Sequence, residues 1–153
     1  GSLASGVDTR FTRIALVMAG GNLPEIVANA LAKGEVDKKM AEKGLTVEDI
    51  RASLGAIEPL TFAHRINPAN VLMLNASDDE IIPKKCTHAL WKKMGKPRIK
   101  WYKGGHYTIS IYLMDVIQEV IRHLTGPVLP RAARAEAPEE EETSAVDATT
   151  PAK

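Results

Sequence analysis

Residues 71–107 decide the fold, and they read VLMLNASDDEIIPKKCTHALWKKMGKPRIKWYKGGHY. The stretch opens with a short, almost continuous apolar run, Val71–Ala76, as expected for a parallel strand covered on both faces. Pro83 is favoured at the first position of a helix, which we predict to run to residue 94. Residues 99–103, IKWYK, alternate more between apolar and polar side chains, which indicates a strand at or near a sheet edge. The stretch therefore predicts a strand, a helix and a second strand.

An acid follows the first of these strands, and a histidine follows the second. Asp79 comes just after Ala76, and His106 comes just after residue 103. In a parallel sheet, two neighbouring strand ends lie about 5 Å apart at the same edge. The carboxylate can therefore contact the imidazole, and the two together would supply two of the three residues of a Ser-His-Asp triad. No convincing nucleophile precedes them in the sequence.

Length and composition limit the classes of protein to consider. A chain of 153 residues makes one domain at most. It is 44% hydrophobic and 25% charged, which is ordinary for a soluble globular protein. The net charge of +1 gives no reason to expect nucleic acid or a membrane surface as a partner. A single cysteine, Cys86, cannot form an internal disulfide, so a reducing, cytoplasmic location is expected.

The remaining elements complete an α/β pattern. Residues 14–19, IALVMA, predict another parallel strand, and residues 108–124 predict a closing helix with one apolar face. The expected fold class is α/β, with about three parallel strands, flanking helices and a helical insertion. Three parallel strands are a poor complete domain, and nothing in residues 1–13 can pair with the free edge of the strand over 14–19. Either another chain completes the sheet or these strands belong to a larger one.

The insertion between the first two predicted strands spans about 50 residues, more than a single crossover helix needs. Asn22 is expected to cap a helix that runs through residue 32. A second, short helix is predicted over residues 36–43. Thr46 with Asp49 resembles a capping box for a third helix, which ends at residue 55. The insertion lies at the edge where strands end, so it forms either one wall of a pocket or a packed excursion without a ligand.

The C-terminal segment has a different character. Residues 127–153 hold six acids against three bases, three prolines before the glutamate run and no aromatic residue. Such a segment cannot bury enough apolar surface to offset its ordering entropy. We therefore predict that residues 127–153 are disordered and that residues 3–126 form the folded domain.

Two motifs give the chain a family resemblance. D-x-x-x-P, with Asp79 and Pro83, and then G-G-H-Y at residues 104–107 resemble the C-terminal third of an α/β-hydrolase. The order and spacing of both motifs over residues 3–125 are most similar to bacterial serine esterases of the dienelactone-hydrolase and acetyl-esterase type. The resemblance implies that this chain corresponds to the C-terminal part of an α/β-hydrolase sheet.

The same resemblance implies a role for each residue of the two motifs. Asp79 would orient the imidazole, and His106 would act as the general base. Asp78 is the alternative for the acid. Gly104 and Gly105 would let the backbone turn tightly enough to present His106. Tyr107 would bind substrate in the acyl pocket or, alternatively, serve packing.

Two elements of the family pattern are absent from the sequence. There is no G-x-S-x-G, and the resemblance places Ser2 and Ser5 several residues after the position of the family's serine. The two backbone N–H groups of an oxyanion hole would also lie elsewhere. The resemblance implies the C-terminal portion of a serine hydrolase for carboxylic esters, inactive alone, with a small-molecule ester as substrate in the intact enzyme. No cofactor and no metal are expected.

Two other functions stay open. The first is a non-catalytic interaction module that pairs with a partner or a second copy through the open edge of the strand over residues 14–19. The second is a flavodoxin-like binder of an anion or nucleotide at the turn formed by Gly20, Gly21 and Asn22. His88 and His123 are interpreted as structural, and no cluster of residues has the spacing of a metal site.

Overall fold

The computed structural model describes residues 1–31, 44 and 46–131. A sheet of three parallel strands lies at its centre, in the order β1-β2-β3. The strands are β1 (Ile14–Val17), β2 (Val71–Ala76) and β3 (Arg98–Tyr102). The predicted α/β architecture with about three parallel strands is confirmed. All six residues of β2 are buried, so this strand is the centre of the core.

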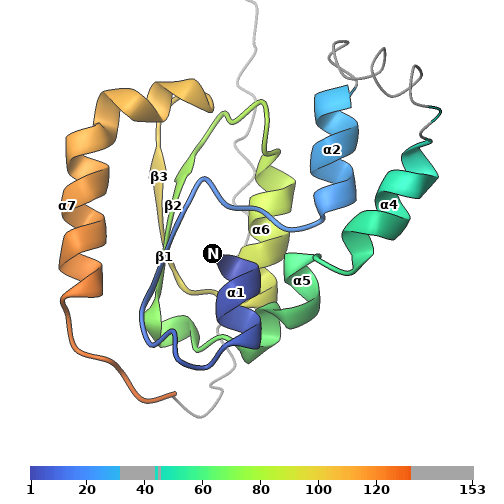
Figure 1. The fold of residues 1–153 in the computed structure, drawn as a ribbon. Coiled ribbons are helices and arrows are strands. Elements are labelled where there is room, and N and C mark those ends of the chain that lie inside the picture. The colour runs from blue at the N-terminus through green and yellow to red at the C-terminus, as the bar shows by residue number, and fades with distance from the viewer. Residues whose placement is uncertain (32–43, 45, 132–153) are drawn as a thin grey trace, which may run out of the picture.

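Helices cover both faces of the sheet (Figure 1). On one face lie η3 (Tyr107–Tyr112) and α7 (Leu113–Leu124), and on the other lie α1 (Ser2–Val7), α5 (Pro59–Phe62) and α6 (Lys84–Lys93). Leu72 and Leu74 pack with Val116 on the α7 face. Val71 and Met73 pack with Leu90 on the α6 face. Each fully buried aliphatic side chain contributes about 1.5–3 kcal/mol to folding, which fixes the strand that carries the acidic loop.

The insertion forms a helical layer beyond the sheet. It contains α2 (Leu23–Leu31), α4 (Val47–Gly55), α5, η1 (Ala63–Arg65) and η2 (Pro68–Asn70), and α2 lies beside α4 (Figure 1). The predicted capping box is present: Thr46 Oγ1 accepts from the Asp49 N–H at 3.2 Å, and Asp49 Oδ2 accepts from the Thr46 N–H at 2.9 Å. The helix predicted over residues 36–43 lies outside the described residues.

Several element boundaries differ from the prediction, and Pro83 is the N-cap of α6 (Lys84–Lys93) rather than its first residue. β1 ends two residues early because Met18 adopts φ 52°, which turns the chain out of the strand direction. β3 begins and ends one residue early, at Arg98 and Tyr102. The predicted closing helix divides into η3 and α7 at Leu113, where the geometry changes from 3-10 to α.

The described start of the C-terminal segment, residues 127–131, is attached to the body of the protein. Leu129 O accepts from Asn67 Nδ2 at 3.0 Å and from Asn70 Nδ2 at 2.8 Å, and Leu129 N donates to Asn70 Oδ1 at 2.8 Å. The rest of the predicted disordered segment lies outside the described residues. No helix within the described ranges has the length and apolarity to cross a bilayer.

Candidate functional site

The acid and the histidine meet at the carboxyl edge of the sheet. The loop after β2 carries Asp79, the loop after β3 carries His106, and Asn75 pairs with Trp101 near the ends of these strands. His106 Nδ1 lies 2.9 Å from Asp79 Oδ2 and 3.1 Å from Asp79 Oδ1. The structure therefore brings together the two side chains that the sequence predicted to be neighbours.

Asp79 is held by its own loop as well as by the imidazole. Its Oδ1 accepts from the backbone N–H groups of Ile81 at 2.9 Å and Ile82 at 2.8 Å. These bonds close the turn that leads into Pro83 and α6. The Asp79 side chain is 3% exposed, whereas that of His106 is 25% exposed. A buried, fixed carboxylate thus orients a partly accessible imidazole.

Asp78, the alternative acid, points elsewhere. Its Oδ2 accepts from Ser77 Oγ at 2.7 Å and from the Gly104 N–H at 3.3 Å. The Ser77 hydroxyl, together with the Gly104 N–H, lowers the pKa of Asp78 below its ordinary value. In the described part of the chain, Asp78 makes no hydrogen bond to the His106 ring. The geometry favours Asp79 as the partner of the imidazole.

The two glycines before His106 meet different structural requirements, one of backbone conformation and one of space. Gly104 adopts φ 117°, a conformation that side chains disfavour, so it provides the tight turn that was expected. Gly105 lies outside the left-handed region. A Cβ at Gly105 would stand 2.3 Å from Glu80 Oε2, so this glycine leaves room for a carboxylate. The expectation of a conformational role is therefore met by Gly104 only.

The far nitrogen of His106 is available for chemistry. The hydrogen bonds of His106 within the described ranges involve its backbone N–H and Nδ1, and none involves Nε2. Tyr107 is 75% exposed, and its ring contacts the His106 ring edge-on at 5.4 Å between centroids. Tyr107 therefore does not pack in the core, and it lies beside the accessible imidazole.

No described side chain supplies a nucleophile to this pair. The nearby hydroxyls of Thr108 and Ser110 donate to Gly105 O and Tyr107 O. Cys86 is buried in α6, and burial raises the pKa of its thiol, which keeps the thiol protonated at neutral pH. Among the residues that the structure describes, no group of three His, Cys, Asp or Glu side chains could hold a metal ion.

The glycine turn after β1 already has its amides engaged. The Gly21 N–H donates to Cys86 O at 3.0 Å. The N–H groups of Asn22 and Leu23 donate to the two carboxylate oxygens of Glu58, at 2.9 and 2.7 Å. Glu58 therefore occupies the start of α2, where an anion would bind, and a phosphate would have to displace it.

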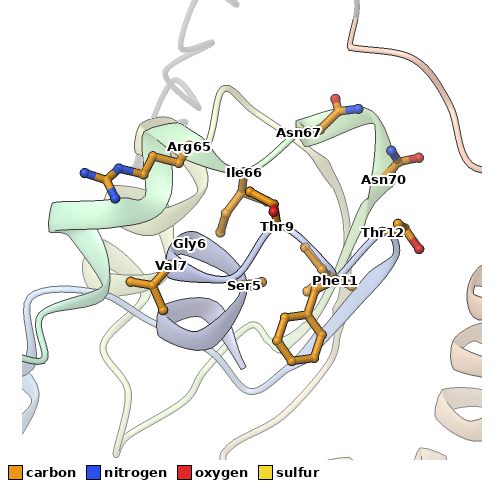
Figure 2. Close-up of a pocket in the computed structure, with 11 residues that line it drawn as sticks. Ser5, Gly6, Val7, Thr9, Phe11, Thr12, Arg65, Ile66, Asn67 and Asn70 are labelled. Atoms are coloured by element: carbon orange, nitrogen blue, oxygen red, sulfur yellow. The ribbon is translucent and has the colours of Figure 1, made fainter.

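A hollow of about 220 Å³ lies at the other end of the sheet (Figure 2). Its walls come from α1, from the segment that leads to β1, and from Arg65, Asn67 and Asn70. Ile14, which opens β1, lines it, so the hollow lies at the amino ends of the strands. The Asp79–His106 pair follows the carboxyl ends, so the hollow and the pair are separate features.

Sequence reasoning missed the residues that brace the pair. Glu80 Oε2 accepts from the His106 N–H at 3.0 Å. Asn29 Nδ2 on α2 donates to Glu80 O at 2.8 Å and to Ile81 O at 3.3 Å. The run of three acids at residues 78–80 was the available signal, because each could reach the neighbouring loop.

In comparisons with known proteins, no protein-family model and no curated protein matches this chain.

Proposed function

We propose that this chain is the C-terminal portion of an α/β-hydrolase-like serine esterase that acts on carboxylic esters of small molecules. Asp79 is its triad acid, His106 is its general base, and the serine lies on polypeptide outside this chain. The observation that carries the proposal is the contact between His106 Nδ1 and the buried Asp79 carboxylate, with Nε2 left without a hydrogen bond in the described structure. With a single cysteine in the chain, we place the enzyme in the cytoplasm.

The geometry of the pair is compatible with the proton path of a Ser-His-Asp triad. With Asp79 accepting from Nδ1–H, Nε2 of the neutral imidazole is the basic nitrogen. Nε2 takes the proton of the serine hydroxyl while the serine oxygen attacks the ester carbonyl carbon. The same proton then passes to the departing alkoxide, which leaves as the alcohol. A water molecule repeats both steps on the acyl-enzyme and releases the carboxylic acid. Tyr107, exposed beside His106, is the substrate-binding residue of this proposal.

The uncovered side of the sheet supports placing the serine outside the chain. Within the described residues, β1 pairs only with β2, so its other edge is open. Another strand that joined this edge in parallel would end at the same edge of the sheet as Asp79 and His106, with β1 between it and β2. A serine after such a strand would approach Nε2 from the open side.

The experiment that tests this function measures how readily His106 reacts as a base and nucleophile. Diethyl pyrocarbonate acylates a neutral imidazole nitrogen, and peptide mass spectrometry gives the rate at each histidine. Asp79→Asn presents an amide N–H to Nδ1 and so moves the ring proton to Nε2. We expect the rate at His106 to fall by about tenfold, while the exposed His64 keeps its rate.

Asp78→Asn is the matched control, because it makes the same change at the adjacent acid that does not contact the imidazole. Equal rates in both variants would remove Asp79 from the triad. Intact-mass analysis after a fluorophosphonate probe completes the test, and we expect no adduct on the folded chain. A single adduct that disappears in His106→Ala would place the nucleophile within this chain and overturn that part of the proposal.

A second candidate function is a non-catalytic interaction module that pairs through β1. The open β1 edge and the exposed apolar side chains beside it favour this alternative. A stable dimer, together with an Asp79→Asn variant that leaves the reactivity of His106 unchanged, would favour the module over the esterase.

A further inference from the structure

Three consecutive acids bind the loop that carries the histidine. Asp78 Oδ2 accepts from the Gly104 N–H at 3.3 Å, and Asp79 accepts from His106 Nδ1 at 2.9 Å. Glu80 Oε2 accepts from the His106 N–H at 3.0 Å. His106 is therefore held at two points, its ring by Asp79 and its backbone by Glu80.

The chain makes room for the Glu80 carboxylate. The three atoms nearest to a Cβ built on Gly105 are Glu80 Oε2 at 2.3 Å, Cδ at 3.1 Å and Oε1 at 3.3 Å. Gly105 needs no left-handed backbone, so the position could accept alanine without conformational strain. The lack of a side chain at Gly105 thus leaves room for the contact between the Glu80 carboxylate and the backbone of His106.

The backbone of Glu80 is braced in turn by the helical insertion. Asn29 Nδ2 donates to Glu80 O at 2.8 Å and to Ile81 O at 3.3 Å. The N–H of Ile81 is one of the two that donate to Asp79 Oδ1. The acidic loop is therefore fixed from α2, and both contacts to His106 depend on that loop.

We propose that Glu80 is a positioning residue, which acts through the His106 backbone to hold the imidazole in register with Asp79. The inference rests on the proposed function, because a histidine needs this alignment only if it acts as the base. Glu80 does not touch the reacting atoms. A carboxylate that accepts a backbone N–H makes a charge-assisted hydrogen bond, which is stronger than a neutral one. Losing it lets the loop over residues 104–106 move and lets the ring leave the Asp79 carboxylate.

The test uses NMR of the full chain in wild type, Glu80→Ala, Glu80→Gln and Gly105→Ala. Deuterium exchange reports the His106 N–H, and the ring ¹⁵N shifts report which ring nitrogen carries the proton. We expect Glu80→Ala to accelerate exchange of the His106 amide about tenfold, as for a lost hydrogen bond. We also expect the Nδ1–H form of the ring, dominant in wild type, to lose population. Glu80→Gln keeps an acceptor oxygen and should restore most of both signals.

Gly105→Ala provides an independent route to the same contact. Its methyl group displaces the Glu80 carboxylate, so the variant should reproduce the changes of Glu80→Ala. Adding Glu80→Ala to Gly105→Ala should then change nothing further, because the contact is already lost. Asp8→Ala is the matched control: it removes a partly exposed carboxylate that pairs with Arg10, and it should leave both His106 signals unchanged.

The outcomes separate this inference from the function on which it rests. Unchanged His106 exchange and ring shifts in Glu80→Ala, with Nδ1–H present in wild type, would overturn the role of Glu80 alone. Fully additive effects of Glu80→Ala and Gly105→Ala would also overturn it. A wild-type ring that carries its proton on Nε2 would instead overturn the Asp79–His106 pair and the proposed function with it. Circular dichroism checks that each variant is folded. If Glu80→Ala does not fold, the same two His106 signals are compared between wild type and Glu80→Gln.

Discussion

The two edges of the sheet are built from different kinds of residue. β3 reads RIKWY, and two of its five residues are cations, Arg98 and Lys100. β1 reads IALV and has no charged residue. Charged side chains are a common device for protecting a strand that ends a sheet. A continuous apolar run is typical of a strand with neighbours on both sides. β3 therefore has the composition of a terminal strand, and β1 has that of an interior strand.

Helix α7 repeats this difference on its two flanks. The flank towards β3 carries Asp115 and Glu119, whose carboxylates accept from Lys100 Nζ at 2.6 and 3.2 Å. Successive residues of a helix lie about 100° apart around its axis, so the residues on the other flank of α7 face the β1 side of the sheet. It presents apolar side chains that are 40–67% exposed: Leu113, Met114, Ile117, Ile121 and Leu124. We call these five residues the α7 apolar flank.

Val17 extends the α7 apolar flank onto the sheet. Ile14 and Leu16 of β1 pack on the α6 face, so Val17 points to the α7 face, where it is 43% exposed. An open strand edge and an exposed apolar helix flank thus lie on the same side of the molecule. The β3 side of the sheet is thus covered by charged contacts, and we call it the finished side; the β1 side exposes a strand edge and apolar side chains, and we call it the unfinished side.

The largest effect that we predict is on self-association through the unfinished side. The isolated chain should form concentration-dependent oligomers that bury the α7 apolar flank. Ile117→Lys with Ile121→Lys places two charges on this flank and should weaken association about hundredfold, about 2.8 kcal/mol, as measured by sedimentation equilibrium.

The matched control carries a charge on the outward face of the same helix. Gln118 is exposed there, so Gln118→Lys should leave association nearly unchanged, whereas Ile117→Lys alone should weaken it. A wild-type chain that stays monomeric throughout, or a control as disruptive as the test variant, would contradict the contrast between the two flanks.

The next effect tests the finished side. Glu119 is buried and accepts from Arg98 Nη2 at 3.0 Å and from Lys100 Nζ at 3.2 Å. Glu119→Ala should reduce the free energy of unfolding by about 1.5 kcal/mol, the contribution of hydrogen bonds to a charged group. Urea unfolding at neutral pH measures this loss. Gln118→Ala, one position away and exposed, should change stability little.

The same network predicts how stability depends on acid. The hydrogen bond from Lys100 lowers the pKa of Glu119 below its ordinary 4.5, and Lys100 with Tyr102 lowers the pKa of Asp115 below 3.8. Carboxylates with a lower pKa in the folded state stabilise the fold above their ordinary pKa. This contribution is lost as pH falls below about 4.5 and passes through the lowered values. In Glu119→Ala the urea midpoint should therefore fall less steeply over this range than in wild type.

The smallest effect concerns His123, which joins the amino ends of β1 and β2. Its Nε2 lies 3.0 Å from both Ile14 O and Asn70 O, and its Nδ1 lies 3.0 Å from Arg13 Nη2. Burial lowers the pKa of His123 below its ordinary 6.5. The unfolded chain therefore binds a proton here before the folded chain does, so stability is full above pH 6.5 and declines below it.

His123→Gln removes this titration and keeps a side-chain donor for the carbonyl groups. Urea midpoints between pH 7.5 and pH 5 should decline less in this variant than in wild type. This pH range lies above about 4.5, where the contribution of Glu119 begins to be lost, so the effects of His123 and Glu119 on stability can be measured separately. An unchanged slope would show that His123 is not a source of the decline.

The sequence was sufficient where local pattern decides structure. The apolar run Val71–Ala76 is β2 without any shift, because a strand buried on both faces has a continuous apolar signal. The capping box at Thr46 and Asp49 is present because it is formed within four residues. The contact of Asp79 with His106 followed from two strand ends and the rule that parallel neighbours finish at one edge.

The sequence was insufficient where a contact joins distant segments. Glu58 binds the start of α2 from 35 residues away, and Asn70 binds Leu129 from 59 residues away. Neither position has a periodic signal, since one polar side chain in a loop can serve many partners. Glu80 was missed for the same reason. Its carboxylate gains a role only when the loop of β3 is placed against it, which requires the register of the whole sheet.

The hydrogen bonds of Asn67 and Asn70 with the backbone of Leu129 have a practical consequence for handling the protein. Asn67 and Asn70 fix the backbone of Leu129 at the amino ends of the strands, far from the loops that hold Asp79 and His106. A fluorophore, affinity handle or surface tether attached at residue 131 would therefore lie at the end of the sheet opposite the histidine. Immobilised in this orientation, the protein would present His106 and the open β1 edge to the solution.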